Sequence, residues 1–175
     1  MNIYLLLAGT TVMIIFSWLF SIKQGRYHGI ARFFSFESIF IIVILNAPVW
    51  FKDPFSVTQL VAWTLLSMSL YFAVAGFLLL GKIGKPKDAD FENTTVLVKE
   101  GLYKYIRHPL YLSLLLGGTG AMMKYAGFYQ VILAVINLVA LWLTARIEEK
   151  EMIARFGDDY REYMKQSKMF IPFIL

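Results

Sequence analysis

The chain has no cysteine among its 175 residues. It can therefore form no disulfide, and it offers no thiolate nucleophile, no cysteine ligand for an iron–sulfur cluster and no cysteine-type zinc site. Charge is also scarce, because Asp, Glu, Lys and Arg make up 17% of the residues whereas hydrophobic residues make up 58%. This is more apolar sequence than one small soluble core can bury. The composition therefore indicates an integral membrane protein.

Apolar runs that could cross a membrane occur five times in the sequence. A transmembrane helix needs about 20 residues to cross ~30 Å of hydrocarbon. The runs cover residues 2–22, 34–51, 56–80, 109–123 and 126–145. The first run has no cleavage site followed by a soluble domain, so we expect it to be retained as a helix. The glycines Gly117, Gly118 and Gly120 in the short fourth run predict that it forms a close hairpin with the fifth.

This pattern predicts an all-α fold class: a polytopic membrane helix bundle with about five transmembrane helices and a C-terminal interfacial amphipathic helix. Three N-terminal transmembrane helices would fill residues 1–81. Residues 82–175 would form a second part with the longest polar loop, the hairpin and a charged tail. Any chemistry is expected in that loop and that tail.

Positive charge lies almost entirely on one side of the predicted helices. Of the 17 Lys and Arg residues, 15 fall on one side and only Lys52 and Lys124 on the other. The positive-inside rule then predicts that the N-terminus lies outside and the C-terminus in the cytoplasm. The short loops and small size favour a prokaryotic plasma membrane. The net charge of +5 is explained by this topology and by attraction to anionic lipids, so no nucleic-acid partner is expected, and nothing indicates an oligomeric state.

The charged tail has the pattern of an amphipathic helix that continues from the fifth run. Its apolar residues recur at helical spacing and are Met152, Phe156, Tyr160 and Tyr163. Gly157 is expected to interrupt this helix, and Asp159 with Glu162 resembles a capping box that would restart it. A helix lying on the membrane with a purely structural role is an equally good interpretation of this pattern.

Charged residues stand at the membrane-proximal ends of both hairpin helices. Glu148 and Glu149 lie near the end of the fifth run, where a carboxylate is costly unless it has a partner or an aqueous cavity, and they would suit a cationic ligand. Arg107 and His108 directly precede the fourth run, and Pro109 stands in its first turn, where a missing N–H costs little. Interfacial Arg and Tyr are usually membrane anchors, so this cluster alone favours anchoring over ligand binding.

Taken together, "GLYKYIRHPLY" at residues 101–111 and "EEKEMIARFGDDYREYM" at residues 148–164 resemble the C-terminal half of isoprenylcysteine carboxyl methyltransferases. The short phospholipid N-methyltransferases share this pair of motifs. The resemblance covers about residues 93–173 and makes 82–175 the expected catalytic half. It implies a membrane enzyme that transfers a methyl group from S-adenosylmethionine to a lipophilic acceptor, with a prenylcysteine-type carboxylate as the first candidate.

The resemblance also implies which residues of this chain bind the cofactor. They are Thr95, Val96, Leu97, Val98, Tyr103, His108, Pro109, Leu110, Tyr111 and Glu148. Arg107, His108 and Glu149 are the expected catalytic residues. The first two would hold the donor's carboxylate or adenine, and His108 or Glu149 would take a proton from an amine acceptor. No metal is expected.

The sequence departs from the family pattern at two positions. A family arginine thought to meet the substrate corresponds to Leu143, and Arg146 is the nearest basic residue, in a different register. Ser113 stands where the family often has glycine, two residues after the motif tyrosine.

Three other interpretations stay open. The acceptor could be a phospholipid amine. Membrane sterol-type reductases, which bind NADPH, have a similar C-terminal region, although Leu110 and Ser113 differ from their usual "RHPNY" pattern. A non-catalytic helical bundle would use Glu148 and Arg107 only to pair two helices.

Overall fold

The computed structural model describes residues 3–86 and 93–171. The helices in these ranges are α1 (Ile3–Phe20), α2 (His28–Asn46), α3 (Val57–Ile83), α4 (Pro109–Met123), α5 (Phe128–Phe156) and α6 (Asp158–Gln166). Short 3₁₀ turns η1 (Ile22–Gln24), η2 (Ala47–Val49) and η3 (Gly101–Lys104) lie between them. The described residues contain no strand beyond one isolated bridge. The all-α prediction is confirmed.

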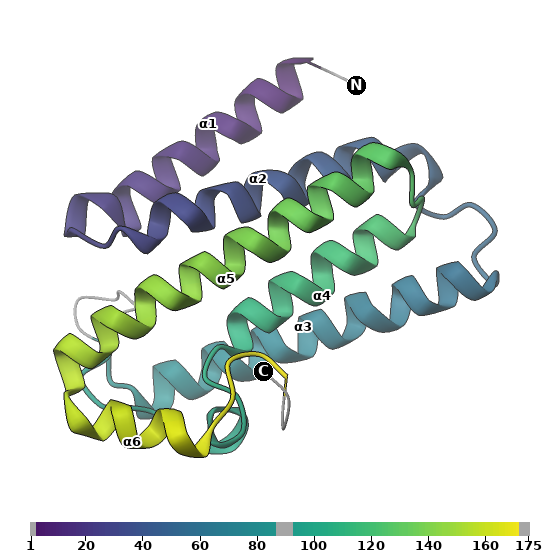
Figure 1. Ribbon diagram of the computed structural model, residues 1–175. Helices are drawn as coiled ribbons and strands as arrows, with labels where there is room; N and C mark the ends of the chain where they lie inside the picture. The colour runs from purple at the N-terminus through teal and green to yellow at the C-terminus, as the bar shows by residue number, and fades with distance from the viewer. Residues whose placement is uncertain (1–2, 87–92, 172–175) are drawn as a thin grey trace.

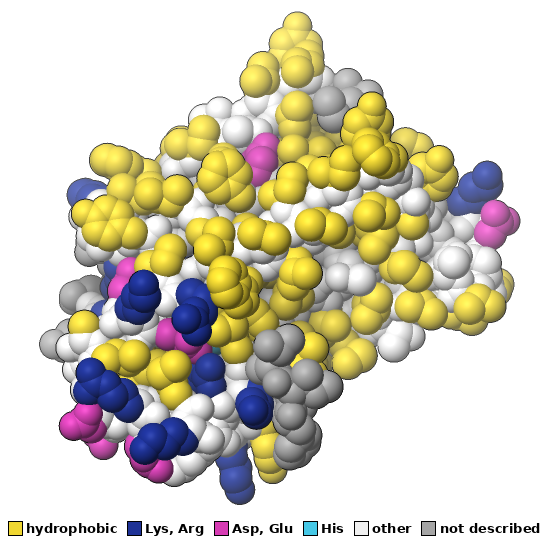
Figure 2. Space-filling model, in the orientation of Figure 1, with side chains coloured by type: hydrophobic (Ala, Val, Ile, Leu, Met, Phe, Trp, Pro, Cys, Tyr) yellow, Lys and Arg dark blue, Asp and Glu magenta, His cyan; other side chains and the backbone are white. Residues whose placement is uncertain are grey.

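Four of these helices, α1, α2, α3 and α5, are long and apolar enough to cross a membrane, whereas α4 is a shorter apolar helix of 15 residues. In Figure 1, α1 to α5 run alongside one another, with α1 on the outside of the bundle. The main packing pairs are α3 with α4 and α2 with α5. Figure 2 shows that hydrophobic side chains cover the long face of the bundle, while charged side chains gather at the end where α6 lies.

The start of the second helix differs most from the predicted apolar run. The second helix begins at His28 rather than at residue 34, because polar residues in its first turns find partners. The Nδ1 atom of His28 lies 2.7 Å from Glu151 Oε2, and Arg32 Nη2 donates to Ser21 Oγ at 2.6 Å. The apolar pattern alone predicts a helix only from residue 34, because these polar residues interrupt it.

The predicted break at Gly157 is confirmed, but the capping box is wrong. Helix α5 ends at Phe156, and Gly157 adopts φ 60°, a conformation that favours glycine. Helix α6 starts directly at Asp158, so Asp159 lies inside its first turn rather than at its N-cap. The two aspartates there still stabilise the helix, because negative charge is favourable at a helix N-terminus.

The glycines of α4 allow close contact with two neighbouring helices. A Cβ added at Gly118 would lie 2.4 Å from Asn137 Nδ2 of α5, and one at Gly120 would lie 3.1 Å from the Ala62 carbonyl oxygen of α3. The side chain of Asn137 in turn accepts a hydrogen bond from Ser35 at 2.7 Å. Gly118 thus lies against α5, as the predicted hairpin requires, whereas Gly117 and Gly120 lie against α3.

The last described residues fasten the loop that leads into α4. After α6 the chain turns back, and the backbone N–H groups of Arg107 and His108 donate to the carbonyls of Lys168 (2.7 Å) and Met169 (3.2 Å). Lys168 N–H donates in return to Tyr105 O at 3.0 Å. The aromatic face of α6 is buried against this loop rather than presented to lipid, since Tyr160 and Tyr163 are both buried.

Candidate functional site

A cavity of about 90 Å³ lies at the charged end of the bundle, between the segment before α4, the end of α5 and helix α6. We call it the polar cavity. It is lined by Arg32, Leu80, Thr94, Leu97, Val98, Tyr103, Arg107, His108, Leu110, Tyr111, Glu148, Met152, Tyr160 and Tyr163. Residues of both sequence motifs therefore meet around one space.

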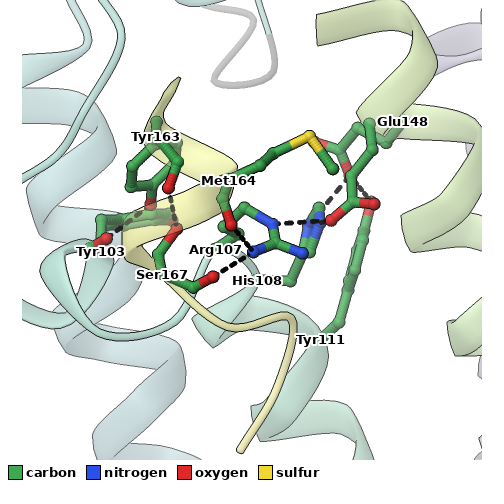
Figure 3. A network of polar contacts seen from close by, with 9 residues as sticks. Tyr103, Arg107, His108, Tyr111, Glu148, Tyr163, Met164 and Ser167 are labelled. Carbon is green, nitrogen blue, oxygen red and sulfur yellow. Dashed lines mark hydrogen bonds and ion pairs between the residues drawn. The ribbon is translucent and has the colours of Figure 1, made fainter. Parts of the chain in front are cut away.

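Glu148 presents a carboxylate to this cavity from α5. The hydroxyl of Tyr111 donates a hydrogen bond to Glu148 Oε2, and His108 Nδ1 lies 3.7 Å from the same oxygen (Figure 3). The rings of His108 and Tyr111 are stacked, with centroids 5.2 Å apart. The Glu148 side chain is 22% exposed, so the carboxylate is oriented by its neighbours and still accessible to a ligand.

Arg107 and Glu149 form a buried ion pair beside the cavity. Arg107 Nε donates to Glu149 Oε1 at 2.7 Å, and both side chains are less than 10% exposed. The guanidinium also donates to the carbonyls of Met164, at 3.4 Å, and Ser167 (Figure 3). The pair therefore joins the α4 entry, the end of α5 and the end of α6, because a buried charge requires such partners.

His108 carries a buried polar atom with no hydrogen bond among the described residues. Its Nε2 lies 3.5 Å from Glu149 Oε1, at the outer range of an ion pair. Buried nitrogen atoms are nearly always hydrogen-bonded in native proteins, so this atom calls for a partner. The residue itself lines the polar cavity, with Nδ1 towards Glu148 and Nε2 towards Glu149.

Three buried tyrosines also line the polar cavity, namely Tyr103, Tyr160 and Tyr163. Tyr163 donates from its hydroxyl to the carbonyl of Tyr103 at 2.5 Å, which fixes α6 on the 3₁₀ turn η3. Burial raises the pKa of Tyr103, Tyr160 and Tyr163 well above the usual value, and the charge of Glu148 adds to the rise for Tyr103 and Tyr160. These hydroxyls therefore stay protonated, so they can donate hydrogen bonds but do not act as bases.

The structure brings most of the expected cofactor residues to the polar cavity. Those that line it are Leu97, Val98, Tyr103, His108, Leu110, Tyr111 and Glu148. Pro109 is buried at the start of α4 and does not line it, and Thr95 and Val96 are exposed, with Thr94 lining the cavity in their place.

Among the expected catalytic residues, Arg107 and His108 line the cavity, whereas Glu149 lies behind Arg107. Arg146 is exposed on α5, where its guanidinium lies 6.0 Å from the centre of the Trp142 ring. It lines no described cavity.

Sequence reasoning missed Arg32 altogether. Met152, Tyr160 and Tyr163 also line the cavity, and the amphipathic pattern of the tail had marked them as one face without assigning them to a site. Arg32 lies one turn into α2 and outside both motifs, and it precedes the predicted second apolar run at residues 34–51, so no pattern in the sequence marks it as a site residue.

A second, larger cavity adjoins the first. It measures about 460 Å³ and opens between α2, α3 and α4; we call it the lateral groove. It is lined by Arg32, Phe36, Ala73, Val74, Phe77, Leu78, Leu110, Tyr111, Ser113 and Leu114. The hydroxyl of Ser113 donates to the carbonyl of Leu110 at 2.6 Å, so this wall of the groove is effectively apolar.

Comparison with known proteins gives relatives that act in methyl transfer. The protein-S-isoprenylcysteine O-methyltransferase of Schizosaccharomyces pombe is 32% identical over 125 residues, which cover 69% of this chain and 52% of that protein. The methanethiol S-methyltransferase of Pseudomonas deceptionensis is 29% identical over 113 residues, 65% of this chain and 40% of that protein. Methanethiol S-methyltransferase 1 of Bradyrhizobium diazoefficiens is 34% identical over 71 residues, which cover 41% of this chain and 24% of that protein.

The chain thus spans about half or less of the length of these relatives. No solved structure gives a significant match. Residues 57–159 match the family model described as phospholipid methyltransferase; they run from α3 to the first turn of α6 and include all of the first motif and residues 148–159 of the second. Because this match covers more than half of the 175 residues, the chain belongs to the phospholipid methyltransferase family.

Proposed function

We propose that this protein is a membrane enzyme that transfers the methyl group of S-adenosylmethionine to a lipophilic acceptor, with a prenylcysteine-type carboxylate as the first candidate. Its family and the names of its relatives support methyl transfer. The observation that carries the proposal is the meeting of two separated motifs at one cavity, where His108 and Tyr111 of the first face Glu148 of the second.

The residues around the polar cavity fit the groups of the donor. S-adenosylmethionine supplies an electrophilic methyl group on a sulfonium, and it also carries an ammonium, a carboxylate, a ribose and an adenine. The accessible carboxylate of Glu148 suits the ammonium or the ribose hydroxyls. His108, which lines the cavity, suits the donor's carboxylate or the adenine edge. The aromatic faces of Tyr103 and Tyr111 suit the sulfonium, through cation–π contacts that contribute about 0.5–2 kcal/mol each.

Donor binding also requires movement at this end of the bundle. The volume of about 90 Å³ is below the roughly 300–1,000 Å³ of pockets that enclose drug-sized ligands. Tyr160 and Tyr163 belong to α6, a helix of nine residues after the Gly157 break. Displacement of this short helix enlarges the cavity while the long helices stay in place, and it breaks the hydrogen bond of Tyr163 to Tyr103 and the contacts of Arg107 to Met164 and Ser167.

The charges favour an acceptor that needs no base. A carboxylate is already ionised at neutral pH, whereas an ammonium must first lose a proton. Glu149, one of the two expected helpers, is already paired with Arg107, which makes it a poor base. Placement of the acceptor oxygen about 3–3.5 Å from the methyl carbon is then the main requirement of the reaction.

The charged end of the bundle, where α6 lies, also supports an orientation in the membrane. The N-terminus lies outside and the C-terminus in the cytoplasm of a prokaryotic plasma membrane, so that the polar cavity faces the water-soluble donor. The gathering of charged side chains around α6 (Figure 2) supports this orientation.

The test is calorimetric titration of the detergent-purified protein with S-adenosylhomocysteine and, separately, with NADPH. We expect binding of the first ligand alone. The variant Glu162→Gln, which changes an exposed carboxylate on α6, serves as a control and should bind as the wild type does. Binding of NADPH alone would identify a reductase, and binding of neither would support a non-catalytic bundle.

A further inference from the structure

The C-terminal part of α5 carries three glutamates that differ in their surroundings, namely Glu148, Glu149 and Glu151. Glu148 lines the polar cavity, and Glu149 is paired with Arg107. The carboxylate of Glu151 lies 2.7 Å from Nδ1 of His28, the first residue of α2. Glu151 lines neither the polar cavity nor the lateral groove, so its pairing with His28 does not serve direct contact with a ligand.

The contact between His28 and Glu151 attaches the end of α5 to a fixed part of α2. The His28 side chain is 3% exposed and that of Glu151 is 28% exposed. Because an ionised carboxylate only accepts hydrogen bonds, His28 Nδ1 carries the proton in this contact. The first turn of α2 is itself packed tightly against the preceding segment, since a Cβ added at Gly29 would lie 2.2 Å from Ser21 Cβ.

Helical geometry places the two paired glutamates on nearly opposite sides of α5. Successive residues on a helix point about 100° apart, so Glu149 points about 100° to one side of Glu148 and Glu151 about 60° to the other side. The Arg107–Glu149 pair holds α5 towards the α4 entry, and the His28–Glu151 contact holds it towards α2. The direction of Glu148 lies between these two contacts.

The His28–Glu151 contact also lies next to two walls of the polar cavity. Arg32, one turn after His28 on α2, and Met152, directly after Glu151 on α5, both line this cavity. Helices α2 and α5 form one of the main packing pairs of the bundle. A change at the contact therefore reaches the cavity walls through one helical turn or less.

We propose that His28 and Glu151 are positioning residues whose contact, together with the Arg107–Glu149 pair, fixes the rotation of α5 and directs Glu148 into the polar cavity. A helix end held on one side can turn about its axis, whereas an end held on two nearly opposite sides cannot. The consequence for methyl-donor binding rests on the proposed function, in which Glu148 contacts the methyl donor. His28 and Glu151 act only through Glu148 and the cavity walls.

The first test compares two variants that each remove one contact between α2 and α5. His28→Ala removes the contact with Glu151, and Ser35→Ala removes the buried hydrogen bond to Asn137 at 2.7 Å, away from the polar cavity. Titration with S-adenosylhomocysteine, at a temperature where both variants are folded, should show at least roughly fivefold weaker binding by His28→Ala. Ser35→Ala should keep the wild-type affinity, although its melting temperature falls. Unchanged binding by His28→Ala, or equal losses in the two variants, would overturn the proposal.

Further variants separate the contact from the size of the side chain. His28→Asn keeps an N–H donor near the position of Nδ1, so it should recover most of the wild-type affinity. Glu151→Ala removes the same contact from its more exposed partner and should weaken binding as His28→Ala does, which keeps the test decisive where His28→Ala fails to fold. The double variant should bind no more weakly than the weaker single variant, because the two residues form one contact. Losses that multiply would show that they act independently, and the positioning role would then be wrong.

A second measurement needs no methyl donor, so it separates failure of this inference from failure of the proposed function. Because the chain has no cysteine, Met152→Cys introduces a single thiol at the polar cavity. Its reaction with a small water-soluble methanethiosulfonate should be several-fold faster when His28→Ala is added, since the end of α5 is no longer fixed. Adding Ser35→Ala should leave the rate unchanged. An unaltered rate with His28→Ala would contradict the clamp even in a protein that binds S-adenosylhomocysteine, and a faster rate would support it in a protein that does not.

Discussion

At the scale of single residues, Glu148 and Glu149 are neighbours in the sequence with different surroundings. Successive residues on a helix point about 100° apart, so one carboxylate faces the polar cavity and the other faces Arg107. Glu148 is 22% exposed and accepts from Tyr111, while Glu149 is 4% exposed and ion-paired. We infer a ligand-binding role for the first and a positioning role for the second.

The same substitution at these two positions should therefore have different effects. Glu148→Gln should lower the affinity for S-adenosylhomocysteine at least roughly tenfold, because one charge–charge contact is lost, with little change in the melting temperature. Glu149→Gln should destabilise the protein by about 3–5 kcal/mol, since it leaves the Arg107 charge buried without its partner. Titration calorimetry and thermal unfolding followed by tryptophan fluorescence measure the two effects. The assignment fails if Glu148→Gln binds normally or if Glu149→Gln unfolds at the wild-type temperature.

At the scale of elements, the placement of α6 depends on the turn at Gly157. Helices α5 and α6 are separated by this one residue, with φ 60° and ψ −130°. A residue with a Cβ atom rarely adopts this conformation. The turn directs Tyr160 and Tyr163 onto the polar cavity, so backbone conformation at one glycine determines whether the cavity has its third wall.

A pair of glycine variants isolates this backbone effect. A Cβ at Gly157, or at Gly81 inside α3, would meet no atom of another segment within 4 Å, so neither change creates a clash with a neighbouring part of the structure. Gly157→Ala should cost about 1–3 kcal/mol through strain and should weaken donor binding. Gly81→Ala should be neutral or stabilising by up to about 1 kcal/mol, because alanine favours the helix. Equal melting temperatures of the two variants would contradict the proposed role of the turn.

The sequence predicts the helices well because each depends on a local pattern. The apolar runs, the continuation of α5 into the tail and the break at Gly157 all follow from composition and periodicity within a short window. The start of α2 was placed too late, because His28 and Arg32 are polar residues whose partners Glu151 and Ser21 lie on other segments. The restart of α6 was misplaced because the positive φ of Gly157, not a side-chain cap, starts this helix.

The sequence predicts only those residues of the candidate site that lie within the two motifs. His108, Tyr111 and Glu148 lie within recognisable segments and meet as expected. The contribution of Arg32 depends on α2 packing beside α4 and α5, which no local pattern specifies. The pairing of Glu149 with Arg107 likewise depends on which face of α5 turns towards the α4 entry.

At the scale of the whole molecule, the two ends of the bundle use positive charge differently. Lys124, one of the two basic residues expected on the outer side, is buried rather than exposed. Its ammonium lies 3.2 Å from the centre of the Trp63 ring and donates to Gln59 Oε1 at 2.8 Å. It therefore fastens the α4–α5 turn to α3. Of the two, only Lys52 is an exposed charge at that end, which strengthens the asymmetry on which the topology depends.

The absence of cysteine allows this topology to be tested without a background signal. Lys52 and Glu162 are both exposed and lie at opposite ends of the bundle. A membrane-impermeant maleimide should label Lys52→Cys in intact cells, because this loop is predicted to lie outside. Glu162→Cys should be labelled only after permeabilisation, because α6 is predicted to lie in the cytoplasm. The wild type is the unlabelled control. The opposite labelling would place the polar cavity away from the cytoplasmic pool of the methyl donor, and a cytoplasmic donor could then not reach Glu148.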